Sequence, residues 1–441
     1  MFAHKFVSLV LVASLLNIAF VPVPSQPAAV AASDDPGIIA YVRPSTHDIH
    51  LVSPDGTGDR VLWTAPRPLA LWPAYDLAWR PDGSELAFSS EHEEACSWYQ
   101  SDVYAIRYDG TGYRRVTNSP ACAVLASLPK GSVSVNVTNW TSSMVQAYVQ
   151  GAPGVQTVFS DGTITFDDVA DFGPGVAQPA VGVWGGYRIM SYPPMADVQP
   201  DETVPGGNLI FSEYSGIDAF GAGKISWKAD GSALAYGMRT SSDISQIPAN
   251  PPYGSIGESL PVVEYAWPDL VAWSPTASTK DQFLYFSQAN PFYEDVAGIY
   301  MNTVGDASGG TLLVPISAFY DAEAVYDIEW LPDASGFLFT KFYVDFEYYT
   351  DIFEYNFTTH EITQLTSFPD DSARGFSISP DGQYVIVERV DDIHSTSSLW
   401  MMNRDGSGLY KFADDAGRPA WGQVPPPSAF SVYLPAIVSD R

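Results

Sequence analysis

Basic residues are scarce in this 441-residue chain, which has 21 Lys and Arg against 51 Asp and Glu and a net charge of −30. Binding to nucleic acid requires a footprint of Lys and Arg against the phosphates, and adsorption to an anionic membrane surface has the same requirement. The charge therefore argues against both nucleic acid and an anionic membrane surface as partners. The acidic excess favours solubility outside the cell, with calcium or a cationic partner as the alternative.

Side chains for metal binding and covalent catalysis are also few. The chain has two cysteines and six histidines, without the H-E-x-x-H, C-x-x-C or His-x-His spacing that would indicate a metal site. A G-x-S-x-G nucleophile elbow is missing, and the length leaves no room for a hydrolase domain. We therefore expect no metal and no cofactor.

Helical periodicity is absent beyond the N-terminus, and only 16% of the residues are charged. Aromatic residues reach 14%, and Pro and Gly contribute 35 residues each. Strands joined by frequent turns account for this composition better than helices do, so the sequence predicts an all-β protein.

The N-terminus is typical of a secretory signal peptide, over residues 1–32. His4 and Lys5 precede an apolar run at 6–20, and Ala29 and Ala31 provide a small-x-small cleavage site. A retained anchor is the alternative, but the run is short for a bilayer span. We expect an exported protein, periplasmic or extracellular at the cell surface, without a membrane span after cleavage.

One sequence motif, called the phrase below, recurs along the chain. It consists of a short apolar strand ending in Trp, a turn that is Pro-Asp-Gly in its fullest form, and a second apolar strand. A second phrase supplies two more strands joined by an Asp-Gly hairpin, as at 55–56, 109–110 and 405–406. Four antiparallel strands make one propeller blade. The phrase begins six times, with its key position at Trp79, Trp227, Trp273, Trp330, Ile378 and Trp421.

The two chain ends would share one blade. The last start, at Trp421, lacks its three following strands, whereas residues 38–42, 48–52 and 60–63 form three strands without a start. The sequence thus predicts a six-bladed β-propeller built from 33–127 and 207–424 and closed by its N- and C-terminal strands. Because the Trp recurs at one strand position, we expect packing between blades rather than sugar stacking.

These phrases resemble the repeats of TolB-type, WD-like β-propellers, with their W-S-P-D-G start and D-G-S-G hairpin. The resemblance covers about residues 30–120 and 207–422. It implies the fold and leaves the function open, because such propellers have many roles.

The stretch from Trp79 to Trp227 is too long for one blade, and its excess, residues 128–206, predicts an inserted β-sandwich. The hairpin at 157–166 and the strand at 185–190 are similar to carboxypeptidase-regulatory-like (transthyretin-like) modules, although their usual opening motif is missing. An immunoglobulin-like sandwich is the alternative.

The two cysteines flank this insertion within the repeat scheme. Cys96 falls between the second and third strands of its blade and Cys122 after the fourth, so both lie on the same face of the disc. Export to an oxidising compartment favours a Cys96–Cys122 disulfide, with two free buried thiols as the alternative.

Two acidic, aromatic loops are the candidate ligand site. Both follow a second strand, which places them on one face of the disc, where propellers present binding loops. An alternative for the second loop is a longer pair of strands. The candidates are Glu91, His92, Glu93, Trp98, Tyr343, Asp345 and Tyr348.

We therefore expect an exported, non-catalytic binding or scaffolding protein that uses a propeller face for a protein or glycan ligand. The alternative is an extracellular carbohydrate-active or peptide-cleaving enzyme with its site on the same loops. A monomer is favoured. Residues 425–441 form a Pro-rich linker and an apolar tail that would dock on the disc or serve in anchoring.

Overall fold

The computed structural model describes most of the blades and part of the insertion. The described residues are 37–66, 74–93, 101–117, 126–139, 145–149, 156–158, 160–171, 179–180, 188–189, 197–212, 221–239, 243–252, 257–263, 267–288, 297–316, 325–342, 349–391, 394 and 396–425. They form strands and turns without a helix, which confirms the all-β prediction. No helix in this part of the chain could therefore span a membrane.

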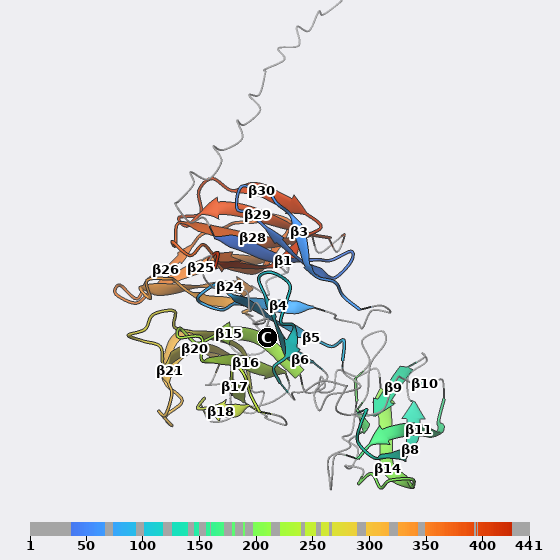
Figure 1. Ribbon diagram of the computed structural model, residues 1–441. Helices are drawn as coiled ribbons and strands as arrows, with labels where there is room; N and C mark the ends of the chain where they lie inside the picture. Colours follow the sequence, from blue (N-terminus) through green and yellow to red (C-terminus); the bar gives the residue numbers. More distant parts are fainter. Residues whose placement is uncertain are drawn as a thin grey trace, which may run out of the picture.

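Six four-stranded antiparallel sheets form the blades of a propeller (Figure 1). Five of them take their strands in sequence order from the inside outwards. Their strands are β4 (Tyr75–Trp79), β5 (Glu85–Ser90), β6 (Asp102–Arg107) and β7 (Arg114–Arg115); β15 (Gly221–Trp227), β16 (Ala233–Arg239), β17 (Ile244–Pro248) and β18 (Glu258–Leu260); β19 (Trp267–Trp273), β20 (Gln282–Gln288), β21 (Gly298–Thr303) and β22 (Thr311–Pro315); β23 (Ile328–Trp330), β24 (Gly336–Phe342), β25 (Thr350–Asn356) and β26 (Ile362–Gln364); and β27 (Ser372–Ile378), β28 (Tyr384–Asp391), β29 (Thr396–Asn403) and β30 (Tyr410–Asp414).

The sixth blade joins the two ends of the repeat array, as predicted. Its order is β3-β2-β1-β31, with the innermost strand β31 (Gly417–Gly422) pairing antiparallel with β1 (Ile38–Arg43). The outer strands are β2 (Asp48–Val52) and β3 (Arg60–Trp63). Ala40 lies opposite Ala420 in this register. The pairing removes the two free sheet edges that an open array would expose.

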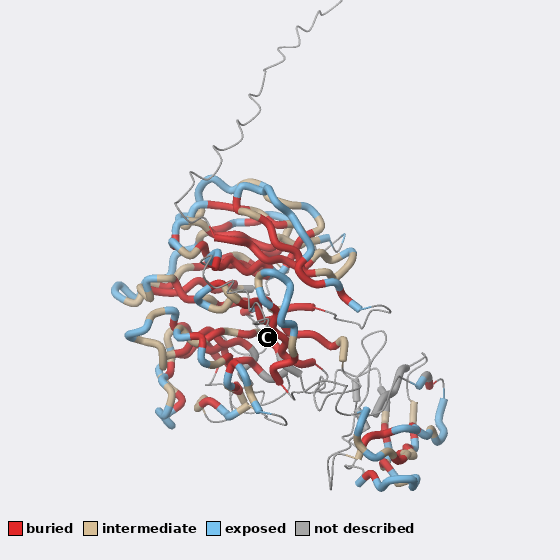
Figure 2. The backbone as a smooth tube through the Cα atoms, viewed as in Figure 1, coloured by how far each residue is buried: buried red, intermediate tan, exposed pale blue. Residues whose placement is uncertain are grey.

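The core of the propeller lies between blades rather than within one blade. Each blade is buried on both faces, so its strands are nearly continuous apolar runs. Six clusters of buried side chains result, each drawn from two neighbouring blades. Leu77 and Ile49 share one cluster, for example, and Ala87 and Tyr236 share the next. Figure 2 shows buried segments running through the blades and exposed segments at their rims.

Strands of the predicted insertion lie between β7 and β15 in the chain and form two further sheets. A four-stranded sheet has the order β11-β8-β14-β13 and a three-stranded sheet the order β10-β9-β12. Figure 1 draws β8 to β11 and β14 as a group beside the blades. The bounds are β8 (Lys130–Asn139), β9 (Val145–Val149), β10 (Gln156–Val158), β11 (Gly162–Ala170), β12 (Pro179–Ala180), β13 (Arg188–Ile189) and β14 (Thr203–Ser212). The predicted boundary at residue 206 falls within β14, which pairs parallel with β8.

Gly422 provides a test of the closing blade. A β-carbon at this position would lie 2.3 Å from Cγ and 2.7 Å from Cβ of Trp79, so Gly422→Ala would force the first and last inner strands apart. Overpacking of this kind costs about 1–3 kcal/mol. We expect a lower urea midpoint of unfolding for this variant. Gly162→Ala, where the added methyl group meets nothing within 4 Å, is the matched control and should not change the midpoint.

Candidate functional site

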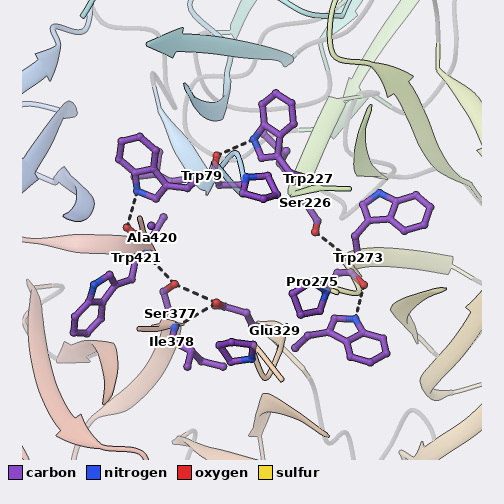
Figure 3. Close-up of a pocket in the computed structure, with 18 of the residues that line it drawn as sticks. Trp79, Ser226, Trp227, Trp273, Pro275, Glu329, Ser377, Ile378, Ala420 and Trp421 are labelled. Atoms are coloured by element: carbon purple, nitrogen blue, oxygen red, sulfur yellow. Dashed lines mark hydrogen bonds between the residues drawn. The ribbon is translucent and has the colours of Figure 1, made fainter. Parts of the chain in front are cut away.

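The recurring Trp side chains tie neighbouring blades together around a central channel (Figure 3). The indole N–H of Trp79 donates to the carbonyl oxygen of Ala420 at 3.1 Å, and that of Trp227 donates to Ala78 at 3.1 Å. Trp330 donates in the same way to Ala272 at 2.8 Å. A buried indole N–H requires an acceptor, and here the preceding blade supplies it. The Trp residues are therefore packing elements of the ring, as predicted.

At the other three contacts between neighbouring blades, the side chain of the residue that precedes the Trp position accepts a hydrogen bond from the next blade. Ser226 Oγ accepts the backbone N–H of Trp273 at 2.8 Å, and Ser377 Oγ accepts that of Trp421 at 3.0 Å. Glu329 Oε1 accepts the backbone N–H of Ile378 at 3.3 Å. Every blade is thus hydrogen-bonded to the next at the channel wall, which makes the wall a continuous ring.

A cavity of about 320 Å³ lies inside this ring. Since side chains alternate along a strand, the residue before each Trp position points into the channel. These residues are Ala78, Ser226, Ala272, Glu329, Ser377 and Ala420. Prolines two positions after the Trp line the cavity next to the turns: Pro81, Pro275, Pro332 and Pro380. The cavity is therefore lined mostly by small and apolar groups, and among the described residues of its lining Glu329 is the one carboxylate.

The channel has two ends, the turn face and the loop face. The turn face is the end where inner strands finish at the turns that contain Pro81, Pro275, Pro332 and Pro380. The loop face is the opposite end, where inner strands begin and second strands finish; Tyr75 of β4 pairs there with Ser89 of β5. The second strands β5 and β24 finish at this end, at Ser90 and Phe342.

Charged side chains form a layer nearer the loop face, three positions before Trp in four of the blades: Asp76, Lys224, Asp327 and Arg418. Lys224 Nζ lies 2.6 Å from Asp327 Oδ1, bridging β15 and the residue before β23 past the intervening blade of β19. Arg418 lies 3.7 Å from Asp76 and 3.9 Å from Glu388. β-Bulges occur here in β4 and β31, and Asp76 and Arg418 have φ of 50° and 53°. These bulges turn charged side chains toward the channel.

Burial and neighbouring charges change the acidity of two of these groups. Burial raises the pKa of Glu329 to about 7, although Lys224 and the hydrogen bonds from Ile378 and Ser377 favour the ionised form. Burial alone would lower the pKa of Lys224, but attraction to Asp327 and Glu329 outweighs it and the pKa is raised. Lys224 therefore stays charged near neutral pH, whereas Glu329 titrates there.

Replacing Glu329 by Gln should change the pH dependence of stability. From about pH 4.5 to pH 7 the folded chain keeps a proton on Glu329 that the unfolded chain releases, so this group lowers stability as pH rises. The full effect is roughly 3 kcal/mol. We expect the free energy of unfolding of Glu329→Gln, relative to that of the wild type, to increase by this amount between pH 4.5 and pH 7. Urea unfolding at a series of pH values measures it.

Glu354→Gln is the matched control for this measurement. Glu354 binds Arg404 at 2.8 Å and does not line the cavity. Its replacement should lower stability without the gain between pH 4.5 and 7. If the free energies of unfolding of Glu329→Gln and the wild type differ by the same amount at every pH from 4.5 to 7, the raised pKa of Glu329 is contradicted.

The three predicted site residues that the structure describes, Glu91, His92 and Glu93, lie on the loop face and contact their own blade. His92 Nδ1 lies 2.6 Å from Ser90 Oγ and its Nε2 lies 2.6 Å from Tyr113 Oη. Glu91 is buried. Trp98, Tyr343, Asp345 and Tyr348 fall outside the described residues, as do both cysteines of the predicted disulfide.

Glu93 belongs to a buried charge network. Its Oε2 accepts a hydrogen bond from Tyr104 at 3.2 Å and lies 3.7 Å from Arg115, which is also 3.6 Å from Asp102. Burial raises the pKa of Glu93, while Arg115 opposes the rise. Asp102 in turn accepts from Thr117 at 2.6 Å, so the chain segments leading to Cys96 and Cys122 meet here. The disulfide itself stays a prediction.

The environment of His92 predicts that its imidazole is neutral at physiological pH. Burial lowers its pKa to about 4, and the charge of Arg115 acts in the same direction. Stability from this neutral imidazole is present above about pH 6.5 and is lost as pH falls towards 4. We expect an NMR titration of the ring to have its midpoint near 4. A midpoint near 6.5, the ordinary value, would show that the ring is exposed to solvent.

No family model matches the chain, and no curated protein matches it either. Among solved structures, TolB from Acinetobacter baumannii is 13% identical, with 88% of this chain and 67% of that chain covered and a TM-score of 0.48. A periplasmic gluconolactonase from Pseudomonas aeruginosa is 10% identical, with 88% and 99% covered and a TM-score of 0.41. An oligogalacturonate lyase in complex with manganese is 12% identical, with 85% and 83% covered and a TM-score of 0.39. The scores are below 0.5, so the six-bladed architecture rests on the strand pairing and the function on the site.

Sequence reasoning did not identify Glu329 and Lys224 as site residues. The signal was present in the repeats themselves. The residue before the Trp position is Ala or Ser in five repeats and Glu in one, and the residue three before it is charged in four. Comparing the repeats position by position would have found both side chains.

Proposed function

We propose that the protein is an exported binding or scaffolding protein that engages a protein or glycan through the loop face. The observation that carries this proposal is an aromatic–guanidinium pair on that face. Tyr326 precedes β23 and is 42% exposed, and the exposed Arg374 of the β27 bulge lies 5.6 Å from its ring centre. Tyr and Arg are, with Trp, the residue types enriched among those that contribute most to binding at protein interfaces.

The surroundings of this pair support recognition rather than a single point contact. Tyr326 donates its backbone N–H to Thr340 Oγ1 at 2.8 Å, which anchors it on β24. The charged layer of the channel lies beside it, through the neighbouring Asp327. Strand β24 of the same blade ends at this face, at Phe342, and Tyr343, Asp345 and Tyr348 follow it in the sequence, outside the described residues. These side chains remain candidates for the same surface.

Replacing both Tyr326 and Arg374 by Ala should remove ligand capture at this face. We expect wild-type protein immobilised on beads to retain a protein partner from extracellular material, or to bind a glycan on an array. The double variant should retain at least about tenfold less of the same ligand. Ile362→Ala, which removes an exposed apolar side chain from β26, the outer strand of the blade that carries Tyr326, is a comparison for general loss of apolar surface and should retain capture.

Two outcomes would contradict the proposal. Equal capture by the double variant would remove the loop-face assignment. Turnover of a glycan or peptide by the wild type would favour the enzymatic alternative, and its dependence on Glu93 or Asp345 would then locate the site.

A further inference from the structure

The cavity lies inside the ring, between the charged layer and the proline turns, and its described lining includes neither Tyr326 nor Arg374. It extends from Lys224 to the prolines of the turns, with Glu329 between them. Figure 3 shows Glu329 reaching from its strand toward Ser377 and Ile378. Both of its hydrogen bonds there, 3.3 Å long, use Oε1. Among the described residues Oε2 has no hydrogen-bond donor, so one carboxylate oxygen in the cavity lining is available to a ligand.

The charges around Glu329 leave a negative excess. Lys224 is neutralised by Asp327, at 2.6 Å. Arg418 lies between Asp76 and Glu388 and balances one of them. Arg80, which also lines the cavity, lies 3.4 Å from Asp82 and 3.5 Å from Glu85 and is neutralised by them. In the charged layer together with Glu329, two cations thus face four carboxylates. In a partly desolvated cavity such an excess favours a bound cation, and the net charge of −30 attracts cations to the molecule as a whole.

The lining indicates which cation fits. Calcium takes six to eight oxygen ligands, and no three His, Cys, Asp or Glu side chains gather into such a set within the described residues. A sugar would need an open aromatic face, but Arg80 lies over Trp227 at 5.6 Å and Lys228 over Trp273 at 5.2 Å. The other Trp residues of the lining pack against aromatic rings of their own: Trp79 against Tyr108, Trp330 against Phe357 and Trp421 against Tyr384. The remaining lining is mostly Ala, Pro and larger apolar side chains, with Ser226, Ser377 and Gln423 as its uncharged polar members, and it suits an aliphatic chain.

We propose that this cavity binds a primary alkylammonium group, with the ammonium donating to Glu329 Oε2 and the alkyl chain lying against the proline layer. This site is independent of the loop face. The free carboxyl group has a pKa of about 7, so the cation binds to its ionised form and releases a proton on the acid side of neutrality.

Isothermal titration calorimetry with n-butylammonium chloride tests the site. We expect wild-type affinity to fall at least about tenfold between about pH 8 and pH 5.5, as Glu329 takes up a proton. The same loss is expected for Glu329→Gln at the higher pH, whereas Glu354→Gln should bind like the wild type. From methyl- to butyl- to hexylammonium the affinity should rise, by up to roughly fourfold per methylene group buried.

Proton release provides a second readout that does not depend on any variant. Titrations near pH 6.5 in two buffers of different ionisation enthalpy should show release of part of a proton per ammonium bound. Binding of 1-butanol or butyrate as tightly as butylammonium would overturn the proposal. So would binding of calcium alone, unchanged binding by Glu329→Gln, or no binding of any ammonium probe. Retained ammonium binding by the Tyr326 and Arg374 double variant would separate this site from the loop-face function.

Discussion

The pairing of β31 with β1 is the interaction on which the remaining structure depends. Without it, the inner strand that carries Trp421 would have no blade, and Ala420 would not be positioned to accept from Trp79. The hydrogen bonds at the channel wall would then stop at two ends rather than run in a circle. The apolar cluster shared by the closing blade and the blade of β4 to β7 would lose one of its sides. A ring that must close also fixes the channel width, and with it the separation of charges that face each other across it.

Because side chains alternate in direction along the inner strands, the strands that form the ring also line the channel. One set of side chains packs between blades, and the other set points into the channel at fixed depths. The shallow layer at the loop face is charged and largely paired within itself. The deeper layer is small, except for Glu329. A long acidic side chain among Ala and Ser occupies space that the neighbours leave open, and its burial there explains why its pKa is raised.

The repeats in the sequence predicted the six blades, their inner strands and the shared closing blade, because each depends on a local phrase that recurs. They could not show that Lys224 meets Asp327, since these residues are 103 positions apart and belong to blades that are not adjacent. Composition identified the acidic loop at Glu91–Glu93. It could not show that Arg115, from a strand of the same blade, would partner the Glu93 carboxylate. Pairing across the ring and between strands depends on geometry that no single phrase encodes.

Hydrogen exchange of β31 measures most directly whether the ring is closed. The account predicts that backbone amides of Gly417–Gly422, including the Trp421 N–H bound to Ser377, exchange as slowly as those of Ser372–Ile378 in the neighbouring inner strand. Exchange of β31 at the rate of an unpaired chain end, with β27 still protected, would contradict closure and remove the basis for the cavity.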